Sequence, residues 1–158
     1  RMTDIEFQSE AERLMPRLKA AAQRYMSDAT SADDVVQDVL MRLWELRDEL
    51  RLPFDALALT LTRNMCVSAL RHKHNTVALE GHDAEDVPSD DSRVELMMRL
   101  IGRLKPMQQL VIRLRHISGE EMSDIAEMTG MSEPAVRKCL SRGRIALRKL
   151  MLEEMTKL

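Results

Sequence analysis

Apolar side chains recur every three or four residues along most of this chain, which is the spacing of one buried face of an α-helix. The first such segment runs from Asp4 to Ser27 and contains Pro16, which is expected to kink or break it. The second begins at Ser31, an expected N-cap that places two aspartates in the first turn, and ends near Leu50. The first third of the chain is therefore predicted to be helical.

A third helical segment begins at Pro53, starts apolar and finishes basic near His74. The pattern then breaks between Asn75 and Ser92, where six acidic residues stand without a lysine or arginine. Such a stretch buries too little apolar surface to fold alone. We interpret 76–92 as an acidic linker that self-repulsion extends.

Helical spacing resumes after the linker. Ser92 and Glu95 have the spacing of a capping box, and Pro106 opens another helix. Few stretches alternate apolar and polar side chains as strands do, and the chain has only five glycines and five prolines. We therefore predict an all-α protein of two small helical domains, 2–75 and 93–158, joined by the acidic linker.

The last domain contains two helices separated by a tight turn. Ser118 and Glu121 have capping-box spacing and are expected to open the first of these helices. Gly130 is expected to end it, because glycine adopts the left-handed conformation without a Cβ penalty. Ser132 is the expected N-cap of the second helix, and Pro134 is tolerated in its first turn. Together these signals predict a helix-turn-helix.

The second of these helices is predicted to bury one face and to present cations on the other. The expected buried residues are Val136, Leu140 and Leu147. The cations are Arg137, Lys138, Arg142, Arg144, Arg148 and Lys149, and no acidic residue occurs from Pro134 to Leu152. A solvated helix face usually mixes both signs of charge. The pattern favours a helix that enters the major groove of DNA, and an ordinary two-helix corner is the alternative.

Composition narrows the classes of protein and site. The apolar content of 44% suffices for packed cores, and 13 methionines with 3% aromatic residues make those cores aliphatic. Cys66 and Cys139 lie far apart inside helical patterns, which fits a reducing, cytosolic compartment. His72 and His74 are two residues apart and share no helix face, so we predict no metal site and no cofactor. The sequence also has no phosphate-binding glycine loop, no catalytic triad pattern and no apolar run of about 18 residues.

The order of these segments resembles a known family. An acidic helix, ADDVVQDVLMRLW, is followed by TRNMCVSALRHK, by the acidic linker, and by LKPMQQLVIRLRHISGEEMSDIAEMTGMSEPAVRKCLSRGRIALRKL. This order resembles the extracytoplasmic-function subfamily of the sigma-70 family of bacterial transcription initiation factors. The resemblance implies that the first domain binds the β′ coiled coil of RNA polymerase and reads the −10 promoter element. The second domain is then expected to lie near the β flap and to read the −35 element.

The resemblance also assigns site residues. The expected polymerase-binding residues are Asp34, Gln37, Asp38, Arg42 and Trp44. The expected −10 DNA-binding residues are Arg63, Asn64, Ser68, Arg71, His72 and Lys73. The expected −35 DNA-binding residues are Ser132, Arg137, Lys138, Ser141, Arg142 and Arg144. At several positions, including Ser68 and Cys139, this chain departs from the residues that the family commonly has, so the promoter sequence is not defined by the resemblance.

The expected partners are core RNA polymerase, promoter DNA and, by analogy with the family, an anti-sigma factor. We expect a cytoplasmic protein without membrane insertion and without enzymatic activity. Two other hypotheses remain open: a helix-turn-helix repressor or activator with an N-terminal dimerisation domain, and a helical adaptor that binds only protein. The ADDVVQDV helix and the acidic linker favour the sigma factor over the repressor.

Overall fold

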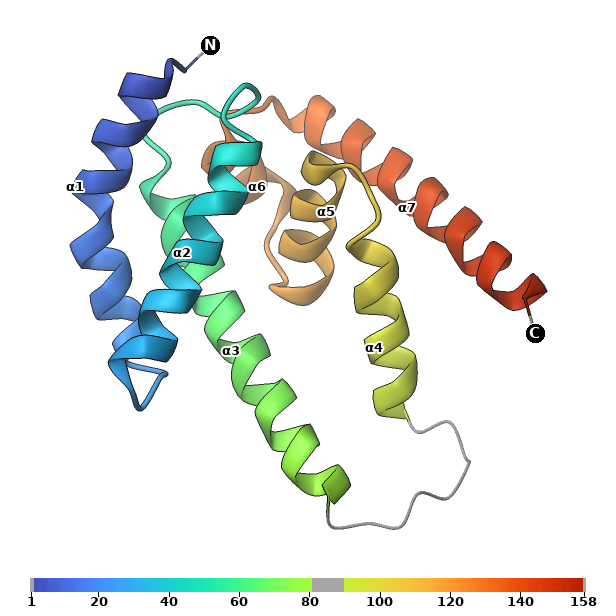
Figure 1. Ribbon diagram of the computed structural model, residues 1–158. Coiled ribbons are helices and arrows are strands. Elements are labelled where there is room, and N and C mark those ends of the chain that lie inside the picture. Colours follow the sequence, from blue (N-terminus) through green and yellow to red (C-terminus); the bar gives the residue numbers. More distant parts are fainter. Residues whose placement is uncertain (1, 81–89, 158) are drawn as a thin grey trace. The chain divides into compact units, whose positions relative to one another are not determined.

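The computed structural model describes residues 2–80 and 90–157, without the side chains of 72–80 and 90–91. All regular elements in these ranges are helices, which confirms the predicted all-α class (Figure 1). The elements are α1 (Asp4–Gln23), α2 (Ala29–Glu45), α3 (Asp55–Glu80), α4 (Asp90–Ile101), α5 (Pro106–Ile112), the π-helix η1 (Arg113–Ile117), α6 (Met122–Thr129) and α7 (Glu133–Thr156).

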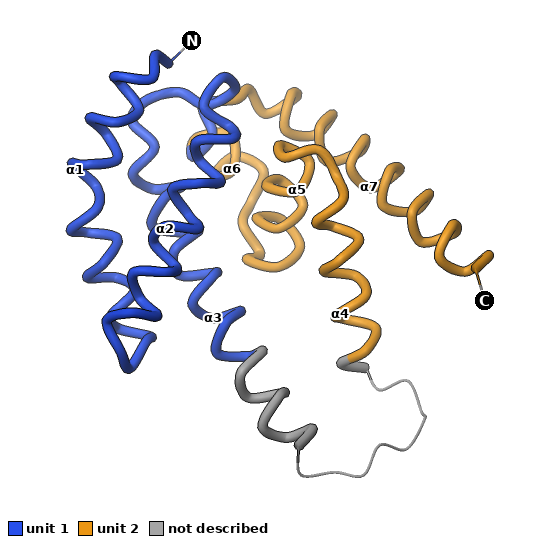
Figure 2. The backbone as a smooth tube through the Cα atoms, in the orientation of Figure 1, with its two compact units in different colours: residues 1–84, 128–130 blue, residues 85–127, 131–158 orange. Residues whose placement is uncertain are grey.

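The chain divides into two compact units, as Figure 2 shows in separate colours. The first comprises Arg1–Ala84 with Met128–Gly130, and the second comprises Glu85–Glu127 with Met131–Leu158. A chain of 158 residues is long enough to build two small apolar cores of this kind. The organisation into two helical units agrees with the sequence pattern.

The first unit packs α1, α2 and α3 against one another in all three pairs. Its core is formed by aliphatic residues that recur at helical spacing on each helix and are fully buried. Among them are Leu14, Leu18, Val36, Leu43 and Leu57. At one end of this core the ring of Phe7 meets Trp44 edge-on, with ring centroids 5.2 Å apart. The ring centroid of Phe54 lies 5.8 Å from that of Phe7.

The second unit is organised around the contact between α5 and α7. The buried residues of this core are Val111 and Ile112 of α5, Leu114 of η1, and Val136 and Leu140 of α7. The two helices approach closely at a glycine in α7. A Cβ added to Gly143 would lie 2.8 Å from Cδ1 of Ile112, closer than carbon atoms tolerate.

Several helix boundaries differ from the predicted ones, with local reasons. α1 continues through Pro16, because Leu14 and Leu18 are fully buried on either side of it and hold both halves in one core. α2 begins before Ser31: Asp28 is its N-cap, and its carboxylate accepts from the backbone N–H of Ser31 at 3.0 Å. The first turn of α2 therefore contains no acidic residue.

The capping box predicted at Ser118 and Glu121 is wrong. Ser118 instead ends η1, and its N–H donates to the carbonyl of Arg113 at 3.0 Å. Gly119 follows with φ +72°, and the N–H of Glu120 donates to the carbonyl of Leu114 at 2.9 Å. This is the glycine-assisted closure of a helix C-terminus, so the same residues that suggested a start form an end. α6 begins only at Met122.

Both ends of the predicted linker are helical. α3 runs to Glu80, and α4 begins at Asp90, two residues before the expected start at Ser92. α3 itself begins at Asp55 rather than at Pro53. The remainder of the predicted linker, 81–89, lies outside the described residues.

Candidate nucleic-acid interface

The turn between α6 and α7 has the predicted geometry. Gly130 has φ +75°, the left-handed conformation that closes α6. Ser132 is extended, with φ −72° and ψ 154°, and its hydroxyl oxygen accepts from the N–H of Ala135 at 3.2 Å. Pro134 lies in the first turn of α7, where its missing N–H has no helical partner to lose. The helix-turn-helix prediction is thus confirmed in its turn and in its second helix.

α7 has one buried row and two exposed rows. The buried row follows the spacing four, three, four through Val136, Leu140 and Gly143 to Leu147, which is half-buried. The first exposed row has the same spacing one residue later: Arg137, Ser141, Arg144 and Arg148. The second follows one residue further on: Lys138, Arg142, Ile145 and Lys149. We call these eight residues the α7 outer face; six of them carry a positive charge.

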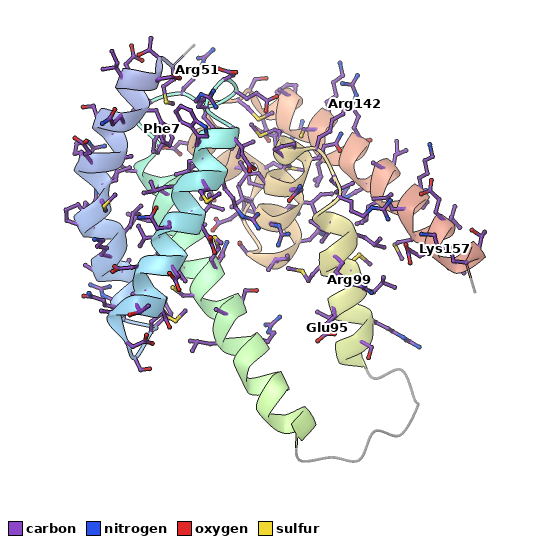
Figure 3. All side chains as sticks on the ribbon, viewed as in Figure 1. Phe7, Arg51, Glu95, Arg99, Arg142 and Lys157 are labelled. Carbon is purple, nitrogen blue, oxygen red and sulfur yellow. The ribbon has the colours of Figure 1, made fainter. Side chains whose placement is uncertain are left out.

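Two cations of the α7 outer face have partners within the second unit. Arg137 donates through Nη2 to Oε1 of Glu133, one turn earlier in α7, at 2.9 Å. Arg144 donates from Nε and Nη2 to Nε2 of His116, at 3.1 and 3.0 Å. The other four, Lys138, Arg142, Arg148 and Lys149, make no ion pair or hydrogen bond with the described residues. Arg142 projects from the side of α7 that faces away from α5 (Figure 3).

The surroundings of His116 favour its neutral form. Partial burial lowers its pKa below the ordinary value of 6.5, and the charges of Arg144 and Arg115 lower it further. A neutral ring retains a lone pair on one nitrogen, and that lone pair is what the two donors of Arg144 require. Hydrogen bond and protonation state are therefore consistent.

In α2, the predicted polar face is exposed. Asp34, Gln37 and Asp38 lie at three-and-four spacing on the side away from the core. Met41 lies on the same face, four residues after Gln37, and is 61% exposed. The sequence reasoning missed Met41, although its spacing from the polar residues put it among them. An exposed methionine surrounded by polar side chains is a typical contact residue.

The two other residues predicted for α2 border this face. Arg42 is half-buried, and Trp44 is 38% exposed. The guanidinium of Arg47 covers the Trp44 ring, with Cζ 3.7 Å from the ring centroid, and donates to the Trp44 carbonyl at 2.8 Å. Phe7 supports the ring from the core side. Trp44 is thus held in one orientation at the edge of the face.

The predicted −10 residues lie on α3. Arg63, Ser68 and Arg71 are exposed, and Asn64 is half-buried. The side chains of the two other predicted residues, His72 and Lys73, lie outside the described residues. Every residue from 67 to 71 is exposed, so none of their side chains belongs to the core of the first unit.

Two exposed apolar residues accompany the cations of α3. Val67 is 43% exposed and Leu70 is 41% exposed, and neither was among the residues predicted for this site. At the start of the same helix, Asp55 accepts from Nη1 and Nη2 of Arg13, at 3.1 and 2.6 Å, and from Arg17 at 3.0 Å. These bonds fasten α1 to the beginning of α3.

The comparisons with known proteins identify the family. The model of sigma-70 region 2 matches residues 11–76, and the model of sigma-70 region 4 matches residues 95–147. The chain belongs to the sigma-70 family, in its extracytoplasmic-function subfamily. All residues that the sequence analysis proposed for polymerase, −10 and −35 contacts lie within these two matched ranges.

Curated sigma factors are similar over most of this chain. The probable RNA polymerase sigma factor RfaY of Xanthomonas campestris is 26% identical over 141 residues, 80% of this chain. The ECF RNA polymerase sigma factor SigJ of Mycobacterium tuberculosis is 28% identical over 155 residues, 88% of this chain. The chain spans only 35% and 49% of the length of these two relatives.

A solved structure of the sigma factor RpoE in complex with the anti-sigma factor NepR from Bartonella quintana is also similar. The match has 26% identity and a TM-score of 0.44, and it covers 92% of this chain and 96% of that one. Among the described residues of this sigma-70 family member, no helix is long and apolar enough to cross a membrane. The same residues contain no cluster of three or more His, Cys, Asp or Glu side chains suited to a metal ion.

Proposed function

We propose that this protein binds core RNA polymerase and directs transcription initiation at promoters whose −10 and −35 elements it reads. Residues 2–75 form the polymerase-binding and −10 domain, and residues 93–158 form the −35 domain. The main support for this proposal is the α7 outer face. It presents six cations in two rows along the helix that follows the turn of the helix-turn-helix. It occurs in a chain that matches both sigma-70 regions in the order of the family.

The α7 outer face suits the major groove of a −35 element. In a helix-turn-helix, the first turns of the second helix meet base edges while more distant cations meet the phosphates. The proposed contacts with bases and the nearest phosphates are therefore Ser132, Arg137, Lys138, Ser141 and Arg142. Arginine holds guanine O6 and N7 through two bonds, worth about 1–3 kcal/mol of discrimination. Arg144 lies about two turns after Arg137 along α7 and contacts the backbone.

The exposed face of α2 is the proposed contact for the β′ coiled coil of the polymerase. Met41 is its apolar anchor, because burial of a methionine is favourable by about 1.5–3 kcal/mol. Asp34, Gln37 and Asp38 surround it and provide polar contacts, as the rim of an interface does. Trp44, held by Arg47, and the half-buried Arg42 complete the border.

The exposed end of α3 is the proposed contact for the −10 element. The proposed contacts with phosphates or bases are Arg63, Arg71, His72 and Lys73. Asn64 and Ser68 are the neighbouring polar contacts. This segment has no Phe, Tyr or Trp, so single-stranded bases cannot rely on extensive stacking on large aromatic rings within it. Contact with an anionic, unpaired strand would instead combine the cations with the apolar Val67 and Leu70.

The remaining expectations follow from the family. The proposed second domain lies near the β flap, the protein acts in the cytoplasm together with polymerase, and an anti-sigma factor holds it inactive. Catalysis of RNA synthesis belongs to the polymerase, and this chain has no enzymatic activity of its own.

The test compares DNA binding with and without core polymerase. We expect the full chain to form a specific promoter complex only when core polymerase is present, and to form it less tightly, by about tenfold, when Met41 is changed to serine. Tight binding of a specific duplex by the free protein, unchanged on addition of polymerase, would instead support a repressor or activator. Retention of function after Arg137→Ala and Arg142→Ala would support a protein-binding adaptor.

A further inference from the structure

We propose that His116 is a positioning residue for Arg144, holding its guanidinium so that the outer edge meets a backbone phosphate of the −35 duplex. The inference rests on the proposed role of α7 in DNA binding. It adds a residue outside the helix-turn-helix to the −35 interface, from a segment 28 residues earlier in the chain.

The contact has a defined geometry. Nε and Nη2 of Arg144 both point at one acceptor, Nε2 of His116, at 3.1 and 3.0 Å. These two nitrogens form the side edge of the guanidinium. Arginine has five N–H donors, so the three that remain include the pair on the end edge. That end edge is the fork that grips two phosphate oxygens.

The location of Arg144 makes this orientation useful. Arg144 is exposed in the same row of the α7 outer face as Arg137 and Arg148. A free arginine on a helix surface samples many rotamers, and ordering it on binding has an entropic cost. A hydrogen bond made before DNA arrives removes part of that cost.

The segment that carries His116 is itself held. His116 lies in η1, which is closed by the bond from the N–H of Ser118 to the carbonyl of Arg113. Its neighbour Arg115 donates to the carbonyl of Glu120 at 3.0 Å. These bonds keep the ring on a short, braced turn rather than on a loose loop.

His116 performs this role only when it is neutral. A protonated ring has no acceptor and adds a positive charge beside Arg144. The charged groups that bear on the ring are Arg115 from its own segment and Arg144 from α7. Both disfavour protonation, so the bond should persist throughout the neutral range and fail only below the ordinary histidine pKa of about 6.5.

The experiment measures the dissociation constant of the promoter complex of core polymerase with the full chain, at several salt concentrations. The variants are His116→Ala, which removes the acceptor; His116→Gln, which retains an acceptor that does not titrate; Arg144→Gln; and Arg144→Gln combined with His116→Ala. The control is Arg93→Gln, which removes an exposed cation from α4 in the same unit. Circular dichroism checks that each variant keeps its helix content.

We expect His116→Ala to weaken the complex about three- to fivefold, the range of one exposed charge-assisted contact, without changing the salt dependence. Arg144→Gln should weaken it about tenfold and reduce the salt slope by about one, as loss of one phosphate contact does. His116→Ala should have no further effect in the Arg144→Gln background. His116→Gln should bind within about twofold of the unchanged protein near pH 8, and better than it once the pH has fallen through the lowered pKa of His116.

Other results would distinguish a failure of the proposed function from a failure of the positioning role of His116. If the unchanged protein forms no polymerase-dependent promoter complex, the proposed function fails. If Arg144→Gln weakens the complex and His116→Ala does not, or if the two effects add, the positioning role fails and the function stands. If lowering the pH through the pKa of His116 makes the unchanged protein bind better than His116→Gln, the imidazolium contacts phosphate directly and the proposal is wrong.

Discussion

A side chain at Gly143 would test most directly how α7 is held against α5. The Cβ of an alanine there would lie 2.8 Å from Cδ1 of Ile112 and 3.4 Å from Cβ of Gln108. Ile112 is only 2% exposed, so its methyl group has no open space to move into. Gly143→Ala is therefore predicted to strain the core of the second unit.

Two opposing effects determine the magnitude. Replacing a glycine inside a helix with alanine is normally stabilising by about 1 kcal/mol. Overpacking a filled core is destabilising by about 1–3 kcal/mol. The net expectation for Gly143→Ala is a loss of about 1 kcal/mol. Ile112→Val removes the colliding methyl group and by itself should cost about 0.5–1.5 kcal/mol. In the Gly143→Ala background that cost should vanish, which corresponds to a coupling free energy of about 0.5–1.5 kcal/mol.

The assay must resolve the two units, because a chain of two compact units need not unfold in a single two-state transition. Amide hydrogen exchange measures the opening free energy separately in α5 and α7, and the amides of α1 to α3 are the internal control. If Gly143→Ala stabilised α7 by the full helix-propensity difference, and Ile112→Val cost the same with and without it, the close approach of the two helices would be refuted.

Three further perturbations have defined outcomes. Arg142→Gln should reduce −35-dependent transcription about tenfold, within the range of a lost two-point guanine contact, whereas Arg93→Gln should leave it unchanged; equal effects would contradict a specific contact. Met41→Ser should weaken binding of core polymerase about tenfold, measured by titration, and Ile5→Ser, which removes another exposed apolar side chain of the same unit, should not. Hydrogen bonding to arginine lowers the pKa of Asp55 below 3.8 in the folded protein, so its stabilisation is present above that pH and is lost as the pH falls through the folded pKa. Asp55→Asn should accordingly lower the free energy of unfolding by less than about 1 kcal/mol at neutral pH, and this difference should disappear in acid. Urea denaturation at several pH values measures it. A difference that did not change with pH would argue against the ion pair.

The helix-turn-helix was predictable because its determinants are local. Gly130, Ser132 and Pro134 each act on the backbone within a few residues, and no competing signal stands nearby. The three-and-four spacing similarly predicted the buried row of α7 and the exposed polar face of α2. These features do not depend on contacts with distant segments.

Boundaries failed where two local signals compete. Asp28 and Ser31 are both good N-caps three residues apart, and the pattern alone did not rank them. Ser118 suggested a helix start, but Gly119 after it closes the preceding helix. At Pro16 the burial of the flanking leucines outweighs the missing hydrogen bond.

Contacts between distant segments could not be read from the sequence. The pairing of His116 with Arg144 depends on how η1 packs beside α7, and no periodicity reports it. The same holds for the fit of Gly143 over Ile112 and for the bonds from Arg13 to Asp55. Met41 is different, because its spacing of four residues from Gln37 is visible in the sequence and places it on the exposed face of α2.

We propose that this chain directs core polymerase to promoters through its two helical units. The most direct measurement is run-off transcription by core polymerase on a genomic library, with and without the full chain, followed by mapping of the start sites. We expect new start sites that share −10 and −35 elements and that disappear when Arg137 and Arg142 are both replaced with alanine. Start sites identical with and without the protein would contradict it.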